Sequence, residues 1–479
     1  MVRSSVVIVG AGISGLAAAW ELSGASDGPH DATPRIEIIE SEKRVGGALA
    51  TTVFAGRTVD LGADGFLSRR PEAVDLIREL GLEDQLEAID ASGASLYLHG
   101  ALYELPNGLV LGVPTKPRDL RNVKGLSRRA RWHVRRDQWF PRRLVVGEDA
   151  SIGQIVRTKL GDELSYQFIE PMIGGIQAGR IDELSAGSVF PALLDAARRG
   201  GSLTKALRPH GPVSPGPASS VIAAAPLFST IHDGVGSLTS ELERRLIERG
   251  VVVRVGVGVS ALRRTPSGTY PWEVDTPTTT TPANAVIMAA PANVAGRLLG
   301  AQHPGLRALE SVQFAGAAMV TFCVASGDIA LPARGTGVLV PLATPWSHHE
   351  TMMVTAITLL DRKWPHLRRD GDVVLRAHVG RIDDERANDL GDDELIERVT
   401  QELRTILGHF ERPRDSLVQR WPHALPQYHV GHERLVRDAR EAAQELRVAL
   451  AGMAYDGVGI PASVASGRRA ARTILAMLA

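Results

Sequence analysis

Short apolar runs that are followed by glycine-bearing turns and helical stretches stand near both ends of the chain. Residues 6–9 are Val-Val-Ile-Val, and a stretch rich in leucine and alanine begins at Leu16. A continuous apolar run bounded by a turn is typical of a strand buried on both faces. The pattern therefore predicts a strand, a turn and a helix at the start of the chain.

The turn after the first strand carries glycines at a characteristic spacing. Gly10, Gly12 and Gly15 stand in a G-x-G-x-x-G register. The first permits a tight turn, the second lets the backbone approach a pyrophosphate, and the third lets the helix pack closely on the strand. A loop at 24–34 leads to a second strand at 35–39, which ends at Glu40, about where an acidic side chain accepts a hydrogen bond from ribose. We predict a dinucleotide-binding unit; a glycine turn without nucleotide is the alternative.

The same alternation of helix and strand returns later in the chain. We predict a helix at 237–249, strands at 251–255 and 285–289, and a strand at 447–452. A glycine-bearing turn and a helix at 460–478 follow the last of these strands. The positive end of that helix points at whatever occupies the turn.

The intervening segments have a different character. The stretch 116–143 is dense in arginine, the stretch 208–220 is rich in Pro, Gly and Ser, and alternating apolar stretches lie between about 301 and 420. We predict an inserted sheet-bearing domain and a helical arm. The expected organisation is a discontinuous nucleotide-binding domain (1–95, 225–300 and 420–479), a substrate-binding domain (96–110 and 301–419) and a helical arm (111–224) with a mobile loop (208–220).

Composition narrows the function classes. With 479 residues and 44% hydrophobic content the chain is long enough for two or three domains with a large core. Zero net charge gives no reason to expect a nucleic-acid partner, and one cysteine, Cys323, allows neither an intramolecular disulfide nor a cysteine metal cluster. We expect Cys323 to fill an apolar strand. Without an apolar run of about 18 residues we expect a cytoplasmic protein, with peripheral membrane contact left open.

Further motifs give the chain a resemblance to a known family. The broader motifs are Gly10 to Gly15, Glu40, Arg44, Gly46-Gly47 and Gly62 to Gly65. The narrower ones are Phe168-Ile169-Glu170-Pro171, Arg420-Trp421-Pro422, Leu450-Ala451-Gly452 and Ser466-Gly467-Arg468. Together they resemble the FAD-dependent porphyrinogen oxidases, within the amine oxidase and phytoene desaturase superfamily. The fold class implied is α/β, a Rossmann-type FAD-binding domain with the inserted domain and arm described above.

The resemblance implies non-covalent FAD and assigns the residues that hold it. These are Gly10, Ala11, Gly12, Ile13, Ser14 and Gly15 at the pyrophosphate, Glu40 and Ser41 at the adenosine, Arg44 and Ala48 along the phosphate and flavin, Gly62, Ala63, Asp64 and Gly65 beside the isoalloxazine, Val259 at the adenine, and Trp421, Val458, Gly459 and Ile460 completing the flavin site. No catalytic side chain and no metal ion are expected, because the flavin carries the hydride transfer. Trp421 as an ordinary core aromatic is the alternative reading of that residue.

The activity implied is the FAD- and oxygen-dependent six-electron oxidation of coproporphyrinogen III to coproporphyrin III in haem biosynthesis, with release of hydrogen peroxide. The protoporphyrinogen-specific branch carries a basic residue where this chain has Asp64, which favours the coproporphyrinogen type. Arg69 and Arg70 are the candidates for binding substrate propionates, because a guanidinium fork matches a carboxylate. An exposed pair at a helix start is the alternative.

Other functions share the cofactor fold. Protoporphyrinogen IX oxidase is the nearest alternative, followed by a carotenoid desaturase, an amine oxidase, a flavin-dependent sugar mutase and a non-catalytic FAD-binding protein. Many related flavoproteins have an acidic residue at the position of Met453, and the porphyrinogen oxidase branch tolerates this departure. The arginine-rich segment 116–143 has three readings: a solvated helical face, contact with an anionic membrane or a haem-pathway enzyme, and contact with substrate.

Overall fold

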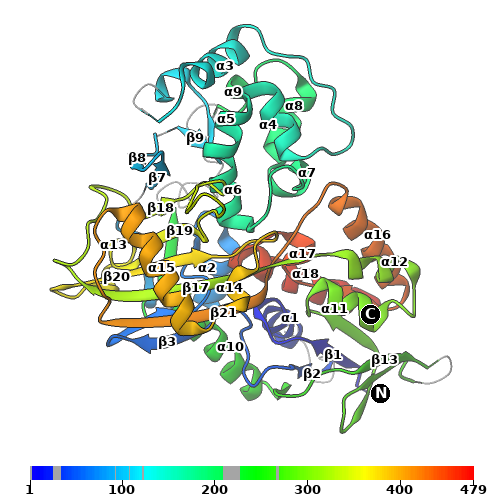
Figure 1. Cartoon of the computed structure of the whole chain (residues 1–479). Helices are drawn as coiled ribbons and strands as arrows, with labels where there is room; N and C mark the ends of the chain where they lie inside the picture. Colours follow the sequence, from blue (N-terminus) through cyan, green and yellow to red (C-terminus); the bar gives the residue numbers. More distant parts are fainter. Residues whose placement is uncertain are drawn as a thin grey trace.

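A parallel sheet, a large second sheet and a helical lobe make up the molecule (Figure 1). The computed structural model describes residues 3–24, 34–91, 93–106, 108–120, 123, 125–208, 227–265 and 269–479. The predicted loops at 24–34 and 208–220 lie outside this set, apart from residues 24, 34 and 208. The fold class expected from the sequence, α/β with an inserted sheet-bearing domain and a helical arm, is confirmed.

The parallel sheet is built from segments far apart in the sequence. Its strands run in the order β12 (Val252–Arg254), β2 (Arg35–Ile39), β1 (Ser5–Val9), β16 (Ala285–Met288) and β22 (Val448–Leu450). Every neighbouring pair is parallel. The predicted strands agree with these bounds to within two residues.

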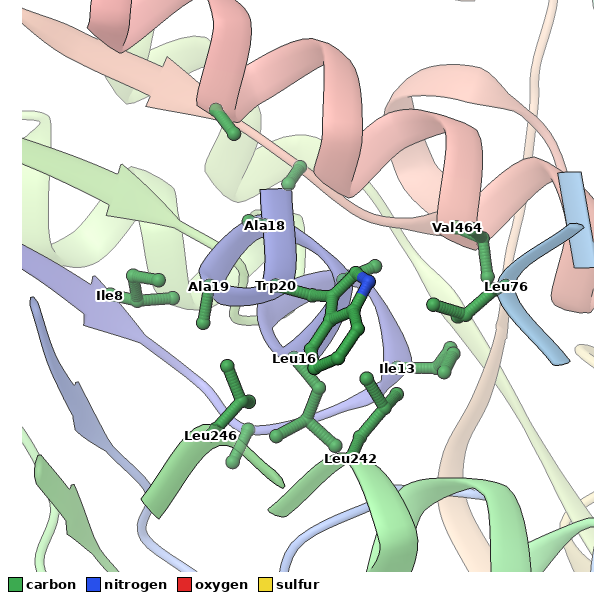
Figure 2. Packing of buried hydrophobic residues seen from close by; sticks show 14 of the residues in the cluster. Ile8, Ile13, Leu16, Ala18, Ala19, Trp20, Leu76, Leu242, Leu246 and Val464 are labelled. Atoms are coloured by element: carbon green, nitrogen blue, oxygen red, sulfur yellow. The ribbon is translucent and has the colours of Figure 1, made fainter. Parts of the chain in front are cut away.

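Helices cover one face of this sheet, and α1 (Ile13–Gly24) lies at their centre. Figure 2 shows its apolar side chains between Ile8 of β1 and the neighbouring helices. Leu242 and Leu246 come from α10 (Gly236–Glu248), Leu76 from α2 (Pro71–Glu79), and Val464 from α18 (Ile460–Leu478). Burial of this many leucine and isoleucine side chains, at about 1.5–3 kcal/mol each, anchors α1 and with it the turn that precedes it.

A second apolar cluster covers the other face. It includes Val7 and Val9 of β1 and the buried Trp272 of β14 (Trp272–Asp275). The strand β14 is central in a small antiparallel sheet with β13 (Ala261–Arg264) and β15 (Thr280–Ala283). The helices α11 (Ala292–Leu299) and α16 (His432–Glu445) pack on the same face. Because both faces are covered, the strands of the parallel sheet can be apolar throughout.

The second sheet has seven strands, of which only β18 and β7 pair in parallel. Their order is β21 (Asp415–Pro426), β17 (Phe314–Ala325), β20 (Asp372–Val379), β19 (Val354–Leu359), β18 (Gly337–Leu339), β7 (Ser95–Leu98) and β8 (Ala101–Glu104). Cys323 is buried in β17, as an apolar strand residue. The predicted domain boundary at residue 420 falls inside β21, because this long strand pairs with β17 along most of its length.

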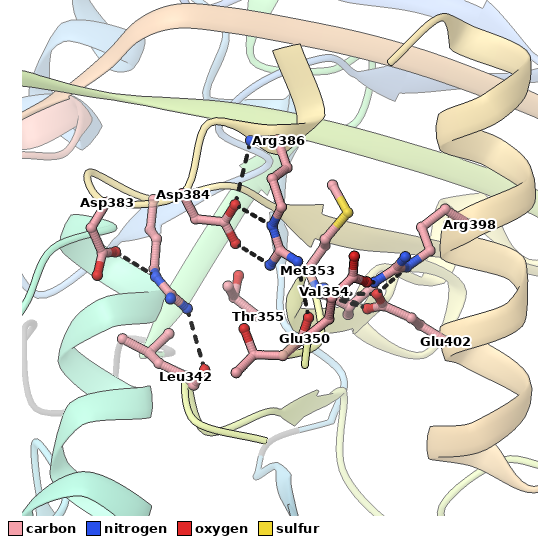
Figure 3. Close-up of polar contacts among 12 residues, drawn as sticks. Leu342, Glu350, Met353, Val354, Thr355, Asp383, Asp384, Arg386, Arg398 and Glu402 are labelled. Carbon is pink, nitrogen blue, oxygen red and sulfur yellow. Dashed lines mark hydrogen bonds and ion pairs between the residues drawn. The ribbon is translucent and has the colours of Figure 1, made fainter. Parts of the chain in front are cut away.

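A buried carboxylate joins this sheet to the helix that covers it. Glu402 lies on α15 (Asp392–Leu407) and is fully buried. It accepts hydrogen bonds from the backbone N–H groups of Met353, at 2.9 Å, and Val354, at 2.8 Å, where β19 begins (Figure 3). Arg398, one turn earlier on α15, pairs with the same carboxylate and with Glu350. The charge of Glu402 is thus compensated, as a buried ion requires.

The helical lobe contains the arginine-rich segment. Its helices are α3 (Arg128–Trp139), α4 (Ile152–Leu160), α5 (Asp162–Leu164), α6 (Glu170–Gln177), α7 (Ala186–Val189), α8 (Pro191–Arg199) and α9 (Leu203–Ala206) (Figure 1). Trp139 at the end of α3 is 74% exposed, and Phe140 beside it is exposed as well. Contact of this segment with an anionic membrane or a haem-pathway enzyme stays a prediction. In the described part of the chain, every helix is too short or too polar to cross a bilayer.

The crossing of α1 and α18 depends on a glycine. A Cβ atom at Gly467 would lie 2.1 Å from the Ser14 carbonyl oxygen, so Gly467→Ala forces the two helices apart. We expect a loss of about 1–3 kcal/mol in stability, measured as a lower unfolding midpoint, together with weaker flavin retention. Gly327 is the control, because a Cβ there meets open space and Gly327→Ala should leave the midpoint unchanged. Equal midpoints for Gly467→Ala and the unaltered protein would contradict the close crossing.

Candidate functional site

The three glycines of the first turn have three different geometries. Gly10 has a φ of +102°, in the region that glycine alone adopts readily. A Cβ at Gly15 would lie 2.0 Å from the Gly10 carbonyl oxygen, so the helix start and the turn touch. A Cβ at Gly12 would meet nothing within 4 Å. Gly12 therefore leaves an open face at the helix N-terminus, where backbone N–H groups favour an anion.

Glu40 is held in place beside this turn. Its Oε2 accepts a hydrogen bond from the Ala11 N–H at 2.7 Å, and its Oε1 accepts one from the Glu42 N–H at 2.8 Å. Ser41 Oγ donates to Oε1 at 3.2 Å. The segment at 256–259 lies alongside, because the Val257 N–H donates to the Glu40 carbonyl oxygen at 2.9 Å. The predicted adenosine-side residues Glu40 and Ser41 are thus near one another and next to the segment that carries Val259.

The loop at 44–49 lies beside Ala11 and Gly12 and leaves the open face of Gly12 uncovered. The Gly46 N–H donates to the Ala11 carbonyl oxygen at 2.8 Å, and a Cβ at Gly47 would lie 3.5 Å from Gly12 Cα. Arg44 donates to the Gly47 carbonyl oxygen at 2.6 Å. Its guanidinium carbon lies 5.9 Å from the ring centroid of Trp421. Arg44 therefore connects the loop at 44–49 with β21 of the second sheet.

The loop at 60–65 meets the same group of residues. A Cβ at Gly62 would lie 2.2 Å from the Ala48 carbonyl oxygen, so only glycine permits this contact. Trp421 Nε1 donates to the Leu61 carbonyl oxygen at 3.0 Å. The structure thus brings together Ala48, Gly62 and Trp421, although Ala48 and Trp421 are 373 residues apart in the sequence.

The C-terminal turn lies at the same edge of the parallel sheet. Both β1 and β22 are followed at their C-terminal ends by glycine turns, and ligands bind at this edge of parallel sheets. Gly457 and Gly459 have φ values of +102° and +105°, and α18 begins directly afterwards at Ile460. Val458, Gly459 and Ile460 are therefore placed where the positive end of α18 faces the turn.

Asp64 has a partner that the sequence did not reveal. Lys363 Nζ lies 2.9 Å from both carboxylate oxygens, and Trp364 Nε1 donates to Oδ2 at 3.1 Å. The charge of Lys363 keeps the pKa of Asp64 well below its ordinary value, against the opposing effect of burial. Ala63 beside it is exposed, whereas a Cβ at Gly65 would lie 2.6 Å from the Trp364 ring.

A buried arginine holds the backbone of the same loop. Arg376 of β20 donates through Nη1 to the Gly62 carbonyl oxygen at 3.2 Å and through Nη2 to the Asp60 carbonyl oxygen. Its Nε donates to Thr321 Oγ1 at 3.2 Å. Sequence reasoning missed both Arg376 and Lys363, because neither stands in a glycine motif or in a recognisable spacing to the loop.

Asp60 closes the other side of the loop. Its Oδ1 accepts a hydrogen bond from the Val235 N–H at 2.8 Å, where the chain enters α10. Burial, with the nearby charge of Asp64, raises its pKa from 3.8 to about 7, although Arg376 acts in the opposite direction. Burial thus favours the protonated form of Asp60.

The predicted substrate arginines lie outside these contacts. Arg69 and Arg70 are exposed in the turn before α2, and Arg70 pairs with Glu72 at 3.3 Å. Among the described residues, the Arg70 side chain is hydrogen-bonded and ion-paired with this neighbouring Glu72 alone. Their role in substrate binding stays a prediction.

The comparisons with known proteins agree with this geometry. A family model described as flavin containing amine oxidoreductase matches residues 13–475. The chain belongs to this family. The coproporphyrinogen III oxidase of Bacillus subtilis (strain 168) is 32% identical, with 99% of each chain covered. The protoporphyrinogen oxidase of Homo sapiens is 30% identical, with 98% of each covered. A crystal structure from Exiguobacterium sp. 255-15, provisionally named protoporphyrinogen oxidase, is 31% identical with a TM-score of 0.85 and 100% of both chains covered.

Family membership identifies the protein as a flavin-dependent oxidoreductase with FAD as its cofactor. The residues present fit that group: an open face at Gly12 for the pyrophosphate, a fixed carboxylate at Glu40, and glycine-lined loops at 46–47 and 62–65. Which individual residues contact FAD stays a prediction, as does its non-covalent attachment.

Because Gly12 has an open face, a substitution there can affect flavin binding without affecting folding. We expect Gly12→Asp to fold normally, because its side chain meets free space, and to purify without yellow colour, because its carboxylate repels the pyrophosphate. Flavin absorbance per chain and the unfolding midpoint of the flavin-free proteins measure the two effects. A yellow variant would contradict the assignment of Gly12.

The raised pKa of Asp60 predicts a pH effect on stability. Between about pH 4 and 7 the folded protein binds a proton that the unfolded chain lacks, so this group's contribution to stability falls as pH rises through that window. Asp60→Asn keeps the acceptor for Val235 and does not titrate. We expect the free energy of unfolding of Asp60→Asn, relative to that of the unaltered protein, to rise from pH 5 to pH 8 by on the order of 1 kcal/mol or more. Denaturant unfolding of both proteins at each pH measures this difference. A constant offset would mean that the pKa of Asp60 is not raised.

Proposed function

We propose that the protein oxidises coproporphyrinogen III to coproporphyrin III, with FAD as the cofactor and oxygen as the electron acceptor. The loss of six electrons and six protons consumes three molecules of oxygen and releases three molecules of hydrogen peroxide. The observation that carries the proposal is the similarity, over nearly the whole of both chains, to the coproporphyrinogen III oxidase of Bacillus subtilis. Bound flavin would accept the electrons in pairs.

The charges near the loop at 60–65 support an anionic substrate. Lys363 pairs with Asp64, and the charge of the buried Arg376 also lowers the pKa of Asp64, while burial favours the neutral form of Asp60. Lys363 keeps about a fifth of its side chain exposed, at 19%. The positive charge there is compatible with the propionates of a porphyrinogen.

The same contacts change the meaning of Asp64. By the resemblance, the protoporphyrinogen-specific branch carries a basic residue at this position, and the absence of one here favours the coproporphyrinogen type. Because Lys363 pairs with Asp64, residue 64 alone does not determine the charge at this position. Protoporphyrinogen IX oxidation is therefore the second candidate, and the similarity to the human protoporphyrinogen oxidase favours including it in the test.

Aerobic turnover tests the reaction and its substrate together. The purified protein is supplied in separate reactions with coproporphyrinogen III and protoporphyrinogen IX, and porphyrin, oxygen and peroxide are measured. We expect a higher kcat/KM for coproporphyrinogen III and about three peroxides per porphyrin. A higher kcat/KM for protoporphyrinogen IX would move the assignment to the second candidate. Porphyrin formation without oxygen uptake would contradict oxygen as the acceptor.

The proposed role of Arg70 has a matched control on the same helix. We expect Arg70→Ala to raise KM for the porphyrinogen about three- to tenfold with little change in kcat, because an exposed arginine contributes binding rather than chemistry. Arg78, at the other end of α2, has the same exposed fraction of its side chain, 47%, and also pairs with carboxylates. Arg78→Ala should leave both constants unchanged. An equal KM for both variants would remove Arg70 from the substrate site.

A further inference from the structure

Two histidines and a glutamate from three separate segments meet beside the small sheet that joins β5 (Phe66–Leu67), β11 (Phe228–Ile231) and β6 (Leu86–Ala88). Glu87 lies on β6, and His232 directly follows β11. His366 lies on the short 3-10 helix η7 (Pro365–Leu367). One ligand atom from each side chain can be chosen so that all three atoms lie within 4.8 Å of one another.

The individual contacts show one shared oxygen. Glu87 Oε2 contacts His366 Nδ1 and lies 3.7 Å from His232 Nδ1. The two imidazole centroids are 5.1 Å apart. Backbone hydrogen bonds fix the frame: the His232 N–H donates to the Gln85 carbonyl oxygen at 2.9 Å, and the His366 N–H donates to Glu87 Oε1 at 3.3 Å.

From this arrangement we infer a binding site for a divalent transition-metal ion, of which Zn²⁺ is the representative, formed by Glu87, His232 and His366. Imidazole nitrogen and carboxylate oxygen are the ligands that Zn²⁺ takes in proteins. Ligand atoms around one tetrahedral ion at bond lengths of about 2.1 Å lie about 3.4 Å apart. The distance between Glu87 Oε2 and His232 Nδ1 is already close to that spacing, and Glu87 Oε2 and His366 Nδ1 would move apart to admit the ion.

The three side chains differ in their exposure to solvent. His366 is buried, with 8% of its side chain exposed, whereas 63% of the His232 side chain is exposed. The Glu87–His366 side of the cluster is therefore enclosed by the protein, and the His232 side is open to an ion that arrives from solvent.

The cluster is close in sequence to residues that contact the loop at 60–65. The helix η7 begins directly after Lys363 and Trp364, whose side chains hold Asp64. An ion bound by all three ligands would tie η7 to β6 and β11. We therefore expect metal binding to stabilise the segment that positions Lys363, without itself touching the flavin or the substrate.

Zn²⁺ binding to untagged, purified holoenzyme tests the inference. The protein competes for Zn²⁺ with a chromophoric chelator, which gives both stoichiometry and affinity. We expect one strong site per chain, and His232→Gln should weaken it at least tenfold, because even changes to groups behind a metal ligand cost about 10–100-fold. His232 is the first choice for substitution, because its exposed ring leaves the contact between Glu87 and His366 in place.

A matched control is His409, an exposed histidine outside the three-residue cluster. Its Nδ1 lies 3.7 Å from Glu411 Oε1, the same distance that separates His232 Nδ1 from Glu87 Oε2. His409→Gln should bind Zn²⁺ like the unaltered protein. As a second measurement, Zn²⁺ should raise the unfolding midpoint of the unaltered protein and of His409→Gln but not that of His232→Gln. Equal affinity in His232→Gln and the unaltered protein, or no binding in either, would overturn the inference. Neither outcome depends on porphyrinogen turnover, so the proposed function is tested separately.

Discussion

The arrangement of the site depends on the hydrogen bonds that the Arg376 guanidinium donates to the loop at 60–65. This guanidinium is buried in β20 of the seven-stranded sheet, yet two of its donors are used by backbone oxygens of residues 60 and 62, beside the parallel sheet. A buried charge costs several kcal/mol unless its hydrogen bonds are satisfied. The loop at 60–65 cannot move away from β20 without leaving this charge unpaired. Its position is therefore set by the second sheet as much as by the first.

Two other contacts between the second sheet or its neighbouring segments and the loop at 60–65 also hold this loop in place. Lys363 holds Asp64, and Trp421 of β21 donates to the backbone of Leu61. The first glycine turn and the loop at 44–49 depend instead on close backbone approach, where Gly15 and Gly46 leave no room for a Cβ atom. The parallel sheet thus supplies the glycine turns predicted to bind a dinucleotide, and the second sheet places charged and aromatic groups against the loop at 60–65.

The parts that could be predicted from the sequence are those with local signals. The strand at 35–39 and the helix at 460–478 follow from apolar patterning, and the tight turn at Gly10 and the close backbone approach at Gly15 follow from the glycine spacing. Longer motifs made the family recognisable before any fold was known. A glycine signals a backbone requirement at its own position, so its meaning survives without knowledge of distant contacts.

The rest depends on contacts between distant segments. Lys363 is 299 residues from Asp64, and Arg376 is 314 residues from Gly62, so no local pattern joins them. The domain boundary predicted at residue 420 falls inside β21. The length of this strand follows from its pairing with the distant β17, which no local sequence pattern signals. For Arg69 and Arg70, the sequence suggested a carboxylate site, whereas the structure shows exposed side chains whose role only substrate binding can decide.

Anaerobic mixing of the purified yellow protein with coproporphyrinogen III tests the central claim most directly, because it isolates electron transfer from the substrate to the flavin. The account predicts that the flavin absorbance bleaches before any oxygen is present, and that porphyrin fluorescence develops fully once oxygen is admitted. If the flavin stays oxidised with both coproporphyrinogen III and protoporphyrinogen IX, the protein is not a porphyrinogen oxidase.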